Sequence, residues 1–356
     1  MKRYGNIYEK IITMDNLREA HRNARKDKLF YEEVKMVDKD PEKYLKEIQE
    51  MLTTGTYKVS EYTVSILKDK GKERELRKLP YFPDRIIQWA IMLQIEPIFM
   101  EVFIPTTCAS IKGRGIHKAS KALVTYMEND PEGTRYCYKI DVRKFYPSIN
   151  HTILKKLLRK KIKDPKLLEL LDNIIDSTEG DTGIPIGSYL SQYLANYYLS
   201  YFDHWIKEEI GVKYYIRYMD DIVILHSSKE YLHELHNKIY QYFTENLLLN
   251  IKDNWQIFPT AIRGVDFAGY RHFYGYKLLR KTTCKRFKKK MLKIKRKMIR
   301  NIPANKTDWS TVNSYHGWLV WCDGYRLKEK YVKPVEQFVE IYYIKFIKGG
   351  LKNACS

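Results

Sequence analysis

Hydrophobic and polar residues alternate along the chain in blocks that predict mostly helices at its start. Residues 1–52 carry apolar side chains at helical spacing, with a break at Asp40-Pro41 and an end near Gly55. Residues 57–80 favour strands on either side of the charged turn KDKGKERE. A further helix is expected over residues 84–99, with Asp84 as its N-terminal cap.

The middle of the chain predicts a sheet with helices between its strands. A basic, Gly-rich loop at 111–118 precedes a helix that runs to Asn129, and the segment YCYKI predicts a buried strand that ends at Asp141. The segment KYYIRYMDDIVILH predicts two apolar strands that meet at Asp220-Asp221. The elements expected around them are helices over 151–162, 188–206 and 229–248, a turn over 183–187, and strands near 256–258 and 266–270.

Composition changes sharply near residue 275. Residues 277–300 hold thirteen Lys or Arg and no Asp or Glu. Their apolar residues are three or four positions apart, which predicts an amphipathic helix with a broad cationic face; these residues are Phe287, Met291, Ile294 and Met298. The segment 281–356 is expected to be a separate helical module, and four of its residues are expected to pack its core: Trp309, Trp318, Leu319 and Trp321.

The net charge of +21 predicts a polyanionic partner, with nucleic acid first and an anionic membrane surface second. No apolar run approaches the roughly 18 residues that a membrane span needs, which weakens the second choice. The five cysteines are scattered and form no C-x-x-C pair, so neither a zinc site nor a disulfide framework is indicated. A reducing, cytoplasmic compartment is therefore expected.

Three carboxylates stand at the ends of apolar strands: Asp141, Asp220 and Asp221. If these strands are neighbours in one sheet, the carboxylates converge and repel one another unless cations bind. Phosphoryl transfer needs such a site, because two Mg²⁺ ions held by fixed carboxylates offset the charge that develops. The alternative is that Asp220-Asp221 is an ordinary turn.

Three motifs resemble those of reverse transcriptases, and they occur in that family's order. Tyr218-Met219-Asp220-Asp221 matches the signature Y-x-D-D. Asp141 with the following FYPSI resembles the family's first carboxylate motif, and GIPIGSYLSQYLAN resembles G-x-P-Q-G-x-x-x-S-P-x-L-x-N. The resemblance implies an α+β right-hand polymerase fold: an N-terminal extension and fingers in 1–135, an antiparallel palm sheet with helices behind it in 136–276, and a helical thumb in 277–356.

The resemblance also implies residue roles. Asp141 and Asp220 would be catalytic and would hold both Mg²⁺ ions, and Asp221 would assist them. Val142 would belong to the same metal site. Mn²⁺ can substitute for Mg²⁺. Tyr146 would exclude a 2′-hydroxyl from the incoming dNTP; its alternative is an ordinary core tyrosine. The other nucleotide contacts implied are Lys72, Arg74, Arg85, Phe145, Ile186 and Gly187. Contacts to template RNA and the RNA–DNA duplex are expected from Lys112, Arg114, Gln192, Tyr218, Met219, Lys281, Lys285, Arg286 and Lys289.

Two departures from the general pattern favour a subgroup. Ile186 stands where most relatives have Gln, and Gln192 where they have Pro. This combination, with Phe267–Arg271 and Lys277–Lys281, resembles the enzymes of diversity-generating retroelements. These enzymes copy a template RNA with frequent errors opposite adenine and work with a small basic accessory protein. A glutamine at this position can hydrogen-bond to the primer or the nucleotide and fix its pose, whereas Ile186 cannot. The loss of this hydrogen bond would lower discrimination between nucleotides.

Three alternatives remain open. The first is a reverse transcriptase of an anti-phage defence or retron-like system, which shares the chemistry but not the biological role. The second is a non-catalytic RNA-binding protein on the same fold, against which the intact Asp141, Asp220 and Asp221 speak. The third is a basic protein of the membrane surface, which would bind liposomes without any dependence on a template.

Overall fold

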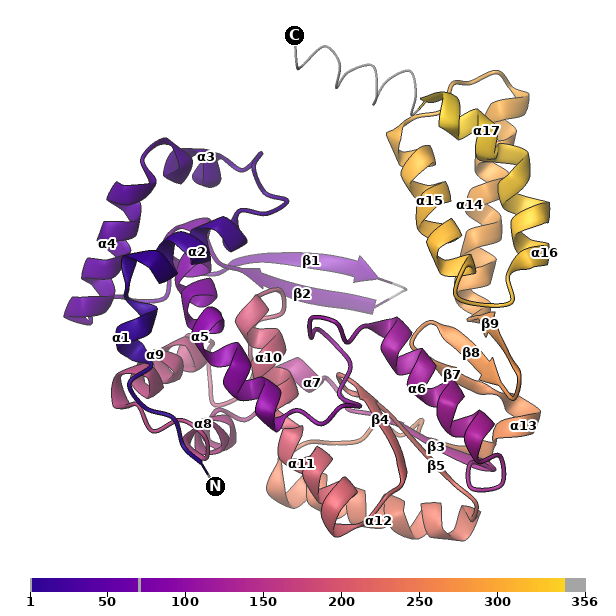
Figure 1. The fold of residues 1–356 in the computed structure, drawn as a ribbon, viewed down its shortest axis with the longest axis horizontal. Coiled ribbons are helices and arrows are strands. Elements are labelled where there is room, and N and C mark those ends of the chain that lie inside the picture. Colours follow the sequence, from indigo (N-terminus) through magenta and orange to yellow (C-terminus); the bar gives the residue numbers. More distant parts are fainter. Residues whose placement is uncertain (1, 70–71, 343–356) are drawn as a thin grey trace. The chain divides into compact units, whose positions relative to one another are not determined.

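The computed structural model describes residues 2–69 and 72–342 (Figure 1). The chain folds into two compact units, each built from three segments. Unit 1 comprises Met1–Lys112, Lys139–Ile222 and Glu230–Trp255. Unit 2 comprises Gly113–Tyr138, Val223–Lys229 and Gln256–Ser356. The division into fingers, palm and thumb remains a prediction.

Unit 1 begins with the helices that the apolar spacing predicts. They are α1 (Tyr8–Ile11), α2 (Met14–Ala24), α3 (Glu32–Lys39) and α4 (Pro41–Thr54). The break at Asp40-Pro41 is confirmed, because the Asp40 side chain caps α4 and Pro41 occupies its first turn. Gly55 ends α4 with a φ of 70°, a conformation that favours glycine.

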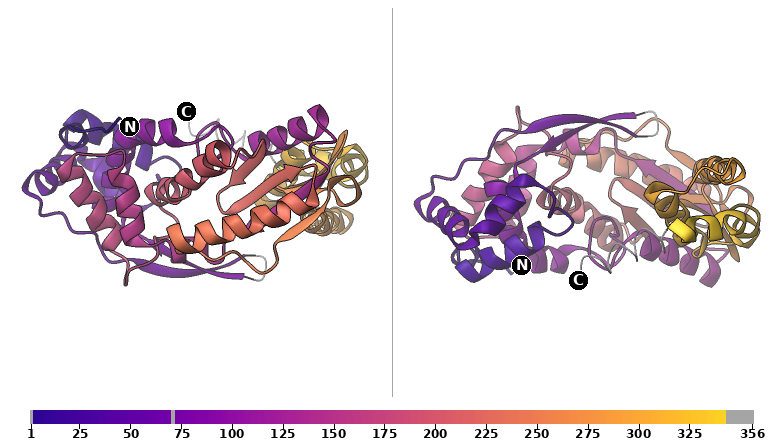
Figure 2. Two further views of the ribbon diagram at one scale, coloured as in Figure 1. Left: turned by 90° about the horizontal axis from the view of Figure 1, so that it is seen from below. Right: turned by 90° about the horizontal axis from the view of Figure 1, so that it is seen from above.

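A two-stranded antiparallel ribbon follows, made of β1 (Thr63–Asp69) and β2 (Lys72–Lys78), and it is seen from two further sides in Figure 2. The segment η1 (Tyr81–Arg85) then leads into the helix α5 (Ile86–Val102). The expectation that Asp84 caps this helix is wrong. Asp84 is fully buried, and its carboxylate accepts hydrogen bonds from the Tyr57 hydroxyl at 2.7 Å and from the Ser60 amide at 3.1 Å. A buried carboxylate needs such donors, and the segment before the ribbon supplies them.

The rest of unit 1 is largely helical. Its helices include α7 (Phe145–Ser148), α8 (His151–Arg159), α9 (Pro165–Asp176), α10 (Tyr189–Tyr198), α11 (Ser200–His204), η2 (Trp205–Glu209) and α12 (Lys229–Asn246). The long helix expected over 188–206 is divided at Leu199 into α10 and α11. Helix α9 was not predicted, although Asp164 caps it and Pro165 opens it, both of which are sequence signals for a helix start.

A four-stranded sheet has the order β4-β5-β3-β6. Its strands are β3 (Tyr136–Asp141), β4 (Tyr214–Tyr218), β5 (Asp221–His226) and β6 (Gln256–Pro259). Within unit 1, the order across the sheet is β4, then the first residues of β5, then the last residues of β3. Within unit 2, the order across the sheet is the rest of β5, then the rest of β3, then β6. The predicted strands around Asp141 and Asp220-Asp221 are thus confirmed as neighbours.

Unit 2 also holds the helix α6 (Ile116–Asn129), a short helix α13 (Thr260–Arg263) and a second small sheet. In this sheet β7 (Val265–Phe267), β8 (Tyr270–Phe273) and β9 (Tyr276–Leu279) pair antiparallel in that order. The helical segments after it are α14 (Lys281–Ile299), α15 (Lys306–Leu319), α16 (Tyr325–Leu327), η3 (Lys328–Val332) and α17 (Lys333–Tyr342).

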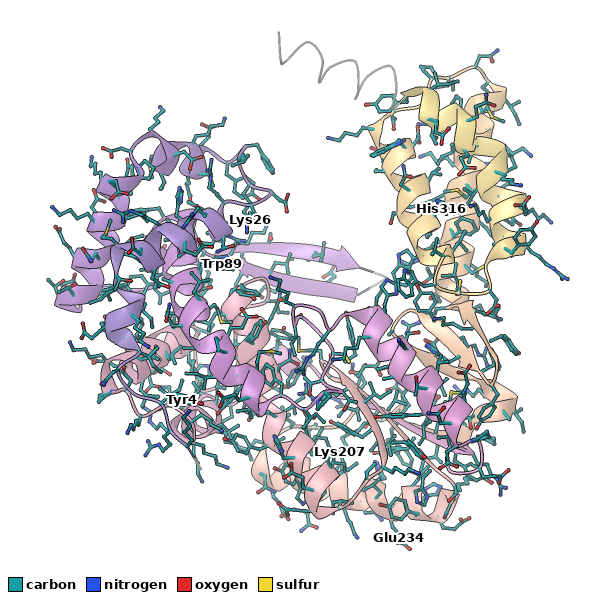
Figure 3. The ribbon with its side chains drawn as sticks, in the orientation of Figure 1. Tyr4, Lys26, Trp89, Lys207, Glu234 and His316 are labelled. Atoms are coloured by element: carbon teal, nitrogen blue, oxygen red, sulfur yellow. The ribbon has the colours of Figure 1, made fainter. Side chains whose placement is uncertain are left out.

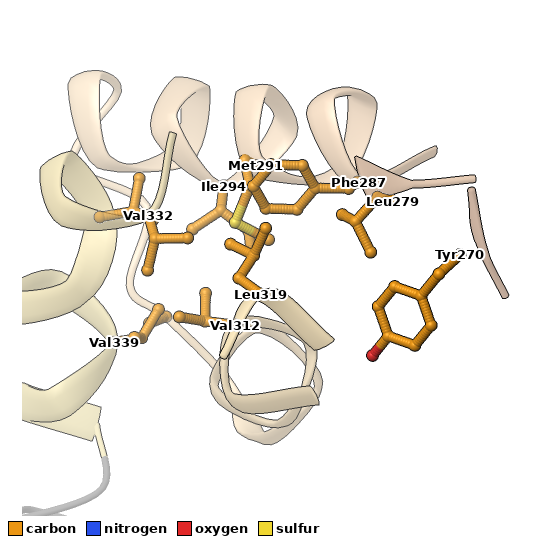
Figure 4. Packing of buried hydrophobic residues seen from close by; sticks show 11 residues of the cluster. Tyr270, Leu279, Phe287, Met291, Ile294, Val312, Leu319, Val332 and Val339 are labelled. Atoms are coloured by element: carbon orange, nitrogen blue, oxygen red, sulfur yellow. The ribbon is translucent and has the colours of Figure 1, made fainter. Parts of the chain in front are cut away.

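One hydrophobic core joins this small sheet to the helices (Figure 4). The predicted stripe of α14 is confirmed for Phe287, Met291 and Ile294, which are buried there, whereas Met298 is half-buried and does not belong to this core. The stripe packs with residues of the sheet and of the later helices: Tyr270, Leu279, Val312, Leu319, Val332, Val335 and Val339. The sheet and the helices after it therefore share their apolar interior.

Trp321 departs from the expectation that it packs this core. Trp309 and Trp318 are partly buried against the core, but Trp321 is 47% exposed. Its ring stacks on His117 of α6, with ring centroids 4.1 Å apart. Trp321 lies in the turn after α15, two residues beyond its last residue, Leu319. The difference shows that hydrophobicity alone does not decide burial near a helix end.

The described residues also bear on the expectations about membrane spans and cysteines. None of the described helices is both long enough and apolar enough to span a bilayer. The four cysteines in the described part of the chain, Cys108, Cys137, Cys284 and Cys322, are free thiols.

Candidate active site

The turn between β4 and β5 carries Asp220. Met219 precedes it with a φ of 58°, in the left-handed region that side chains with a Cβ rarely adopt. Such a conformation persists only where the surrounding structure holds it. The residue that does so here is Arg217, whose Nη1 donates a hydrogen bond to the Met219 carbonyl oxygen at 3.1 Å.

Arg217 is itself held by a buried ion pair. Its side chain is fully buried, as is that of Asp203, and the Nη2–Oδ2 distance between them is 2.5 Å. The Nε of Arg217 also donates to Asp203 Oδ1 at 2.7 Å. Removing either partner would leave an uncompensated charge in the interior, which is costly. The pair therefore fixes the strand end from which Asp220 projects.

Further hydrogen bonds complete this network. Asn196 accepts from Arg217 Nη1 through its side-chain oxygen at 3.1 Å and donates to the Ala109 carbonyl at 2.8 Å. Thr107 and Tyr215 both donate their hydroxyl groups to Asp203. Sequence reasoning missed this network, although a cation inside the apolar strand YYIRY is a signal that a buried partner exists.

Asp141 stands at the end of β3, beside residues 250–252. The Lys252 amide donates to the Asp141 carbonyl at 2.9 Å, and the Lys252 ammonium pairs with the Asp141 carboxylate. The next residue, Val142, is 1% exposed and forms a β-bridge with Ile251. This backbone pairing fixes the position of the carboxylate, and Val142 has only a main-chain carbonyl to offer a ligand.

The structure brings the carboxyl groups of Asp141 and Asp220 together. Burial, the charge of Asp141 and a hydrogen bond that the protonated Asp220 donates to the Asp141 carboxylate raise the pKa of Asp220 well above the usual range for an aspartate. Two carboxylates this close cannot both be charged unless a proton or another cation lies between them. The Lys252 ammonium already offsets part of this charge, and a bound divalent cation would relieve the remaining repulsion.

Asp221 is the next residue, and its carboxylate is paired with Lys139 at 3.2 Å. Among the residues that the structure describes, no group of three or more His, Cys, Asp or Glu side chains is arranged to hold a metal ion. The structure thus brings two of the three predicted carboxylates together. Oxygen donors from Asp141 and Asp220 fit the preference of Mg²⁺, but the metal and catalytic roles remain predictions.

Tyr146 lies against the same turn. Its hydroxyl contacts the Met219 sulfur at 3.9 Å, and burial together with the charge of Asp220 raises the pKa of Tyr146. Phe145 is 3% exposed and packs edge-on against the Tyr146 ring. The predicted proximity of Tyr146 to the carboxylates is therefore present, while its role in sugar selection remains a prediction.

The loop over 183–187 runs beside the segment that carries Tyr146. The Gly183 amide donates to the Ile149 carbonyl at 2.8 Å, and the Ile184 amide donates to the Tyr146 carbonyl at 3.1 Å. Gly187, at the end of the loop, has a φ of 123°, which favours glycine. Ile186 is half-buried and lines a cavity together with Arg85.

The other residues predicted to contact nucleotide or nucleic acid belong to several different elements of the two units. The side chains of Lys72 and Arg74 lie outside the described part of the structure. Tyr218 and Gln192 are half-buried in unit 1, where Lys112 is exposed, and Arg114 is half-exposed in unit 2. The predicted cations of α14 are all exposed: Lys281, Lys285, Arg286 and Lys289. These positions suit contacts with a large polyanion, which remain predictions.

Two curated proteins resemble this chain in sequence. The chain is 25% identical to the protein YkfC of Escherichia coli K12 over 171 residues, which are 45% of each chain. It is 28% identical over 131 residues, 36% of this chain, to the group II intron-encoded protein LtrA of Lactococcus lactis subsp. cremoris. The chain thus spans 45% and 21% of the lengths of these two curated relatives.

A solved structure supports the fold, and a family profile decides the classification. The structure of telomerase from Candida albicans in complex with a fragment of telomeric RNA matches with a TM-score of 0.50 and 11% identity. The match covers 82% of this chain and 58% of that one, so it supports the predicted α+β right-hand polymerase fold. The profile described as "Reverse transcriptase (RNA-dependent DNA polymerase)" matches residues 66–263, more than half of the chain. With its paired carboxylates at the ends of neighbouring strands, this chain belongs to the reverse transcriptase family.

Proposed function

We propose that the chain is an RNA-directed DNA polymerase that extends a primer with dNTPs on a template RNA. The observation that carries the proposal is the meeting of the Asp141 and Asp220 carboxyl groups at the ends of neighbouring strands. Such a pair binds divalent cations through oxygen donors. Proteins of this family and charge are expected to act on nucleic acid, and the cytoplasm is the compartment we propose.

Asp141 and Asp220 would hold two Mg²⁺ ions, or Mn²⁺ in their place, with the Val142 carbonyl as a further ligand and Asp221 assisting. When bound, these ions offset the negative charge that develops on the transferred phosphoryl group. Arg217 positions Asp220 through the turn at Met219, and Lys252 positions Asp141. The exposed cations of α14 bind the phosphates of the duplex without regard to sequence.

A primer-extension assay with sequenced products tests this proposal. A labelled DNA primer is annealed in turn to RNA templates of different sequence and incubated with protein, Mg²⁺ and all four dNTPs. The product should be the complement of each template. No extension, or extension whose sequence ignores the template, would reject RNA-directed synthesis and favour a non-catalytic RNA-binding protein.

We further propose that the enzyme belongs to a diversity-generating retroelement. Ile186 and Gln192 support this assignment, because Ile186 places a branched apolar side chain where a glutamine would hydrogen-bond. Error rates measured separately opposite each template base test it. An excess of errors opposite adenine is expected, and equal rates at all four bases would reject the subgroup.

A reverse transcriptase of an anti-phage defence or retron-like system is the competing role. Loss of phage protection in a strain carrying Asp220→Ala and Asp221→Ala would favour that role. In the retroelement role, we expect the enzyme to act with its template RNA and a small basic accessory protein. Sequencing the RNA and protein that co-purify with the native enzyme distinguishes the two roles.

A further inference from the structure

A group of cations lies in unit 1, where the N-terminal segment meets the end of α8. Residues 3–5 run beside residues 161–163, and Tyr4 of this segment is labelled in Figure 3. The Tyr4 amide donates to the Lys161 carbonyl, and the Tyr4 carbonyl accepts from the Lys163 amide, both at 2.7 Å. This backbone pairing holds cations of the two segments side by side. We call these cations the α8 patch, and they are Lys2, Arg3, Lys156, Lys160, Lys161 and Lys163.

The side chains of the α8 patch lie at the surface. Five of the six are exposed, and Lys161 is half-buried. The Lys163 side chain lies against Gly5, since a Cβ at Gly5 would be 3.2 Å from Lys163 Cε. The Lys160 ammonium lies over the ring of Tyr201, 4.1 Å from its centroid. Both stems are therefore packed on the protein, which leaves less side-chain entropy to lose when an anion binds.

Acids of the neighbouring helix α9 do not neutralise this charge. Asp172 pairs with Arg159 and Asp176 pairs with Lys155, and both of these cations lie outside the α8 patch. None of the six patch cations forms an ion pair with any residue in 2–69 or 72–342. Their charges repel one another, and an anionic partner would relieve that repulsion.

Two acids adjoin the α8 patch and lower its charge in part. Glu101 accepts a hydrogen bond from the Tyr4 hydroxyl at 2.7 Å, and Glu169 lines a hollow of about 440 Å³ together with Lys163. The six cations outnumber these two carboxylates, so the patch stays positive. A surface of this kind attracts a polyanion across about one Debye length, roughly 8–10 Å at moderate salt.

The composition of the α8 patch limits the class of its partner. Single-stranded nucleic acid is bound by exposed aromatic side chains on which bases stack, and protein interfaces are rich in aromatic residues and poor in lysine. A membrane surface is bound by cations that flank exposed apolar side chains. No residue in 2–28 or 145–213 is a large hydrophobic residue with an exposed side chain. The patch therefore fits a row of phosphates and offers nothing to bases or to lipid chains.

We infer that the α8 patch binds a double-stranded segment of RNA through its phosphates. A duplex presents phosphates at its surface and keeps its bases inside, which matches a surface with many lysines and without exposed aromatic rings. The inference goes beyond the proposed function, because a stem that is held here is not the strand that is copied. The choice of RNA over DNA rests on the proposed function, since an enzyme that copies RNA meets folded RNA.

Binding of an RNA hairpin to the full chain tests this surface. The protein is first saturated with an unlabelled primer–template, so that the proposed duplex contacts of α14 are occupied. A fluorescent blunt-ended RNA hairpin is then titrated in without dNTPs, and its anisotropy is measured at several salt concentrations. The hairpin should bind to the saturated protein, and its affinity should fall steeply as salt rises. Absence of hairpin binding overturns the inference.

Neutral variants of the patch test which cations bind. The triple variant Lys160→Gln, Lys161→Gln, Lys163→Gln should lose about tenfold or more in hairpin affinity. The slope of log affinity against log salt should become shallower by about two to three, because each phosphate contact contributes about 0.9. Arginine at the same three positions keeps the charge and should keep the binding. Hairpin binding by the glutamine variant at the wild-type affinity overturns the inference.

A matched control removes the same charge elsewhere in unit 1. Lys43→Gln, Lys46→Gln and Lys238→Gln change exposed lysines of α4 and α12 that form no ion pair with a described residue. This triple variant should lose about twofold or less in affinity, because the charges that it removes are not gathered in one patch. Equal losses in the two triple variants would show that net charge alone binds the hairpin, and would overturn the inference.

Further measurements separate this surface from its rivals and from the proposed function. A DNA hairpin that binds more tightly than the RNA hairpin overturns the choice of RNA. Vesicles containing phosphatidylserine that bind through the three lysines, while the RNA hairpin does not, identify a membrane surface instead. Primer extension on a short unstructured template should be equal in wild type and the glutamine variant of the patch. If the hairpin binds through the patch but no protein extends a primer, the surface stands and the polymerase proposal falls.

Discussion

Arg217 Nη1 donates a hydrogen bond to the carbonyl oxygen of Met219 at 3.1 Å, and this bond ties a buried ion pair to the turn that carries Asp220. Met219 has a φ of 58°, which a residue with a side chain adopts only under restraint. The fully buried Arg217–Asp203 pair supplies that restraint. The position of the carboxylate therefore depends on residues that touch no substrate.

Arg217→Met should destabilise the protein by about 3–5 kcal/mol, because it leaves the Asp203 carboxylate buried without its partner. Urea denaturation followed by circular dichroism measures the loss. Arg159→Met is the control, since Arg159 pairs with Asp172 at the surface and should lose only about 1 kcal/mol or less. Similar losses of unfolding free energy in the two variants would show that the buried Arg217–Asp203 pair does not stabilise the turn at Met219.

Tyr146→Ala should weaken discrimination against ribonucleotides. The Tyr146 ring lies beside Met219 and Asp220, where its bulk would meet a 2′-hydroxyl. We expect the ratio of kcat/KM for dNTP over rNTP to fall about tenfold or more, within the range found for steric pocket changes. Tyr146→Phe keeps the ring and should leave the ratio unchanged. An unaltered ratio in the alanine variant would mean that Tyr146 only packs.

Gly269→Ala should destabilise unit 2 more than Gly275→Ala. Both glycines have a positive φ, 88° and 78°, so each substitution costs about 1–2 kcal/mol from backbone conformation. A Cβ at Gly269 would lie 2.4 Å from the Trp318 ring, whereas none of the described atoms is within 4 Å of one at Gly275. The clash should add about 1–3 kcal/mol. Urea midpoints measure the difference, and equal values would refute the close packing of the turn between β7 and β8 on Trp318 of α15.

We expect the folded protein to lose stability in mild acid because of the titration of His21. Burial lowers the pKa of His21, although the charge of Asp38 opposes this effect and Arg25 adds to it. The Nδ1 of His21 is 2.7 Å from the Tyr81 hydroxyl, and its Nε2 is 3.0 Å from Asp38. The unfolded chain binds a proton near pH 6.5, before the folded chain does, so the stabilisation present above that pH is lost as pH falls.

Urea unfolding at pH 7.5 and pH 5.5 measures this effect. Wild type should lose more stability between the two values than His21→Gln, by up to about 1.4 kcal/mol per pH unit of the titration window. Gln cannot titrate, so its pH slope should be shallower even though its absolute stability is lower. Equal slopes in the two proteins would show that His21 does not link folding to pH.

Apolar runs allowed the sequence to predict the strands beneath the candidate site. YCYKI and KYYIRYMDDIVILH are apolar on both faces, which fixed β3, β4 and β5 and placed Asp141 and Asp220 at their ends. The helical spacing of α14 was equally clear. These features depend on local pattern, and the structure confirms them.

Long-range pairing could not be predicted in the same way. Arg217 pairs with Asp203 and Lys139 pairs with Asp221, and nothing in the local sequence names either partner. Trp321 was expected in the core and lies against His117 at the surface, because its position depends on how α15 ends. Lys252 adjoins Asp141 because the bridge between Val142 and Ile251 and the hydrogen bond from the Lys252 amide to the Asp141 carbonyl bring the two segments together.

The measurement that tests the central claim most directly is Mg²⁺-dependent primer extension on an RNA template by wild type, Asp141→Asn and Asp220→Asn. Ser148→Ala is the matched control, since Ser148 lies on α7, shortly after Asp141, and its hydroxyl bonds to the Arg143 carbonyl and to no other described residue. Wild type and the control should extend the primer, and each asparagine variant should lose at least about a hundredfold in rate, as expected when transition-state charge stabilisation is removed. Extension at the wild-type rate by either folded asparagine variant would contradict the account.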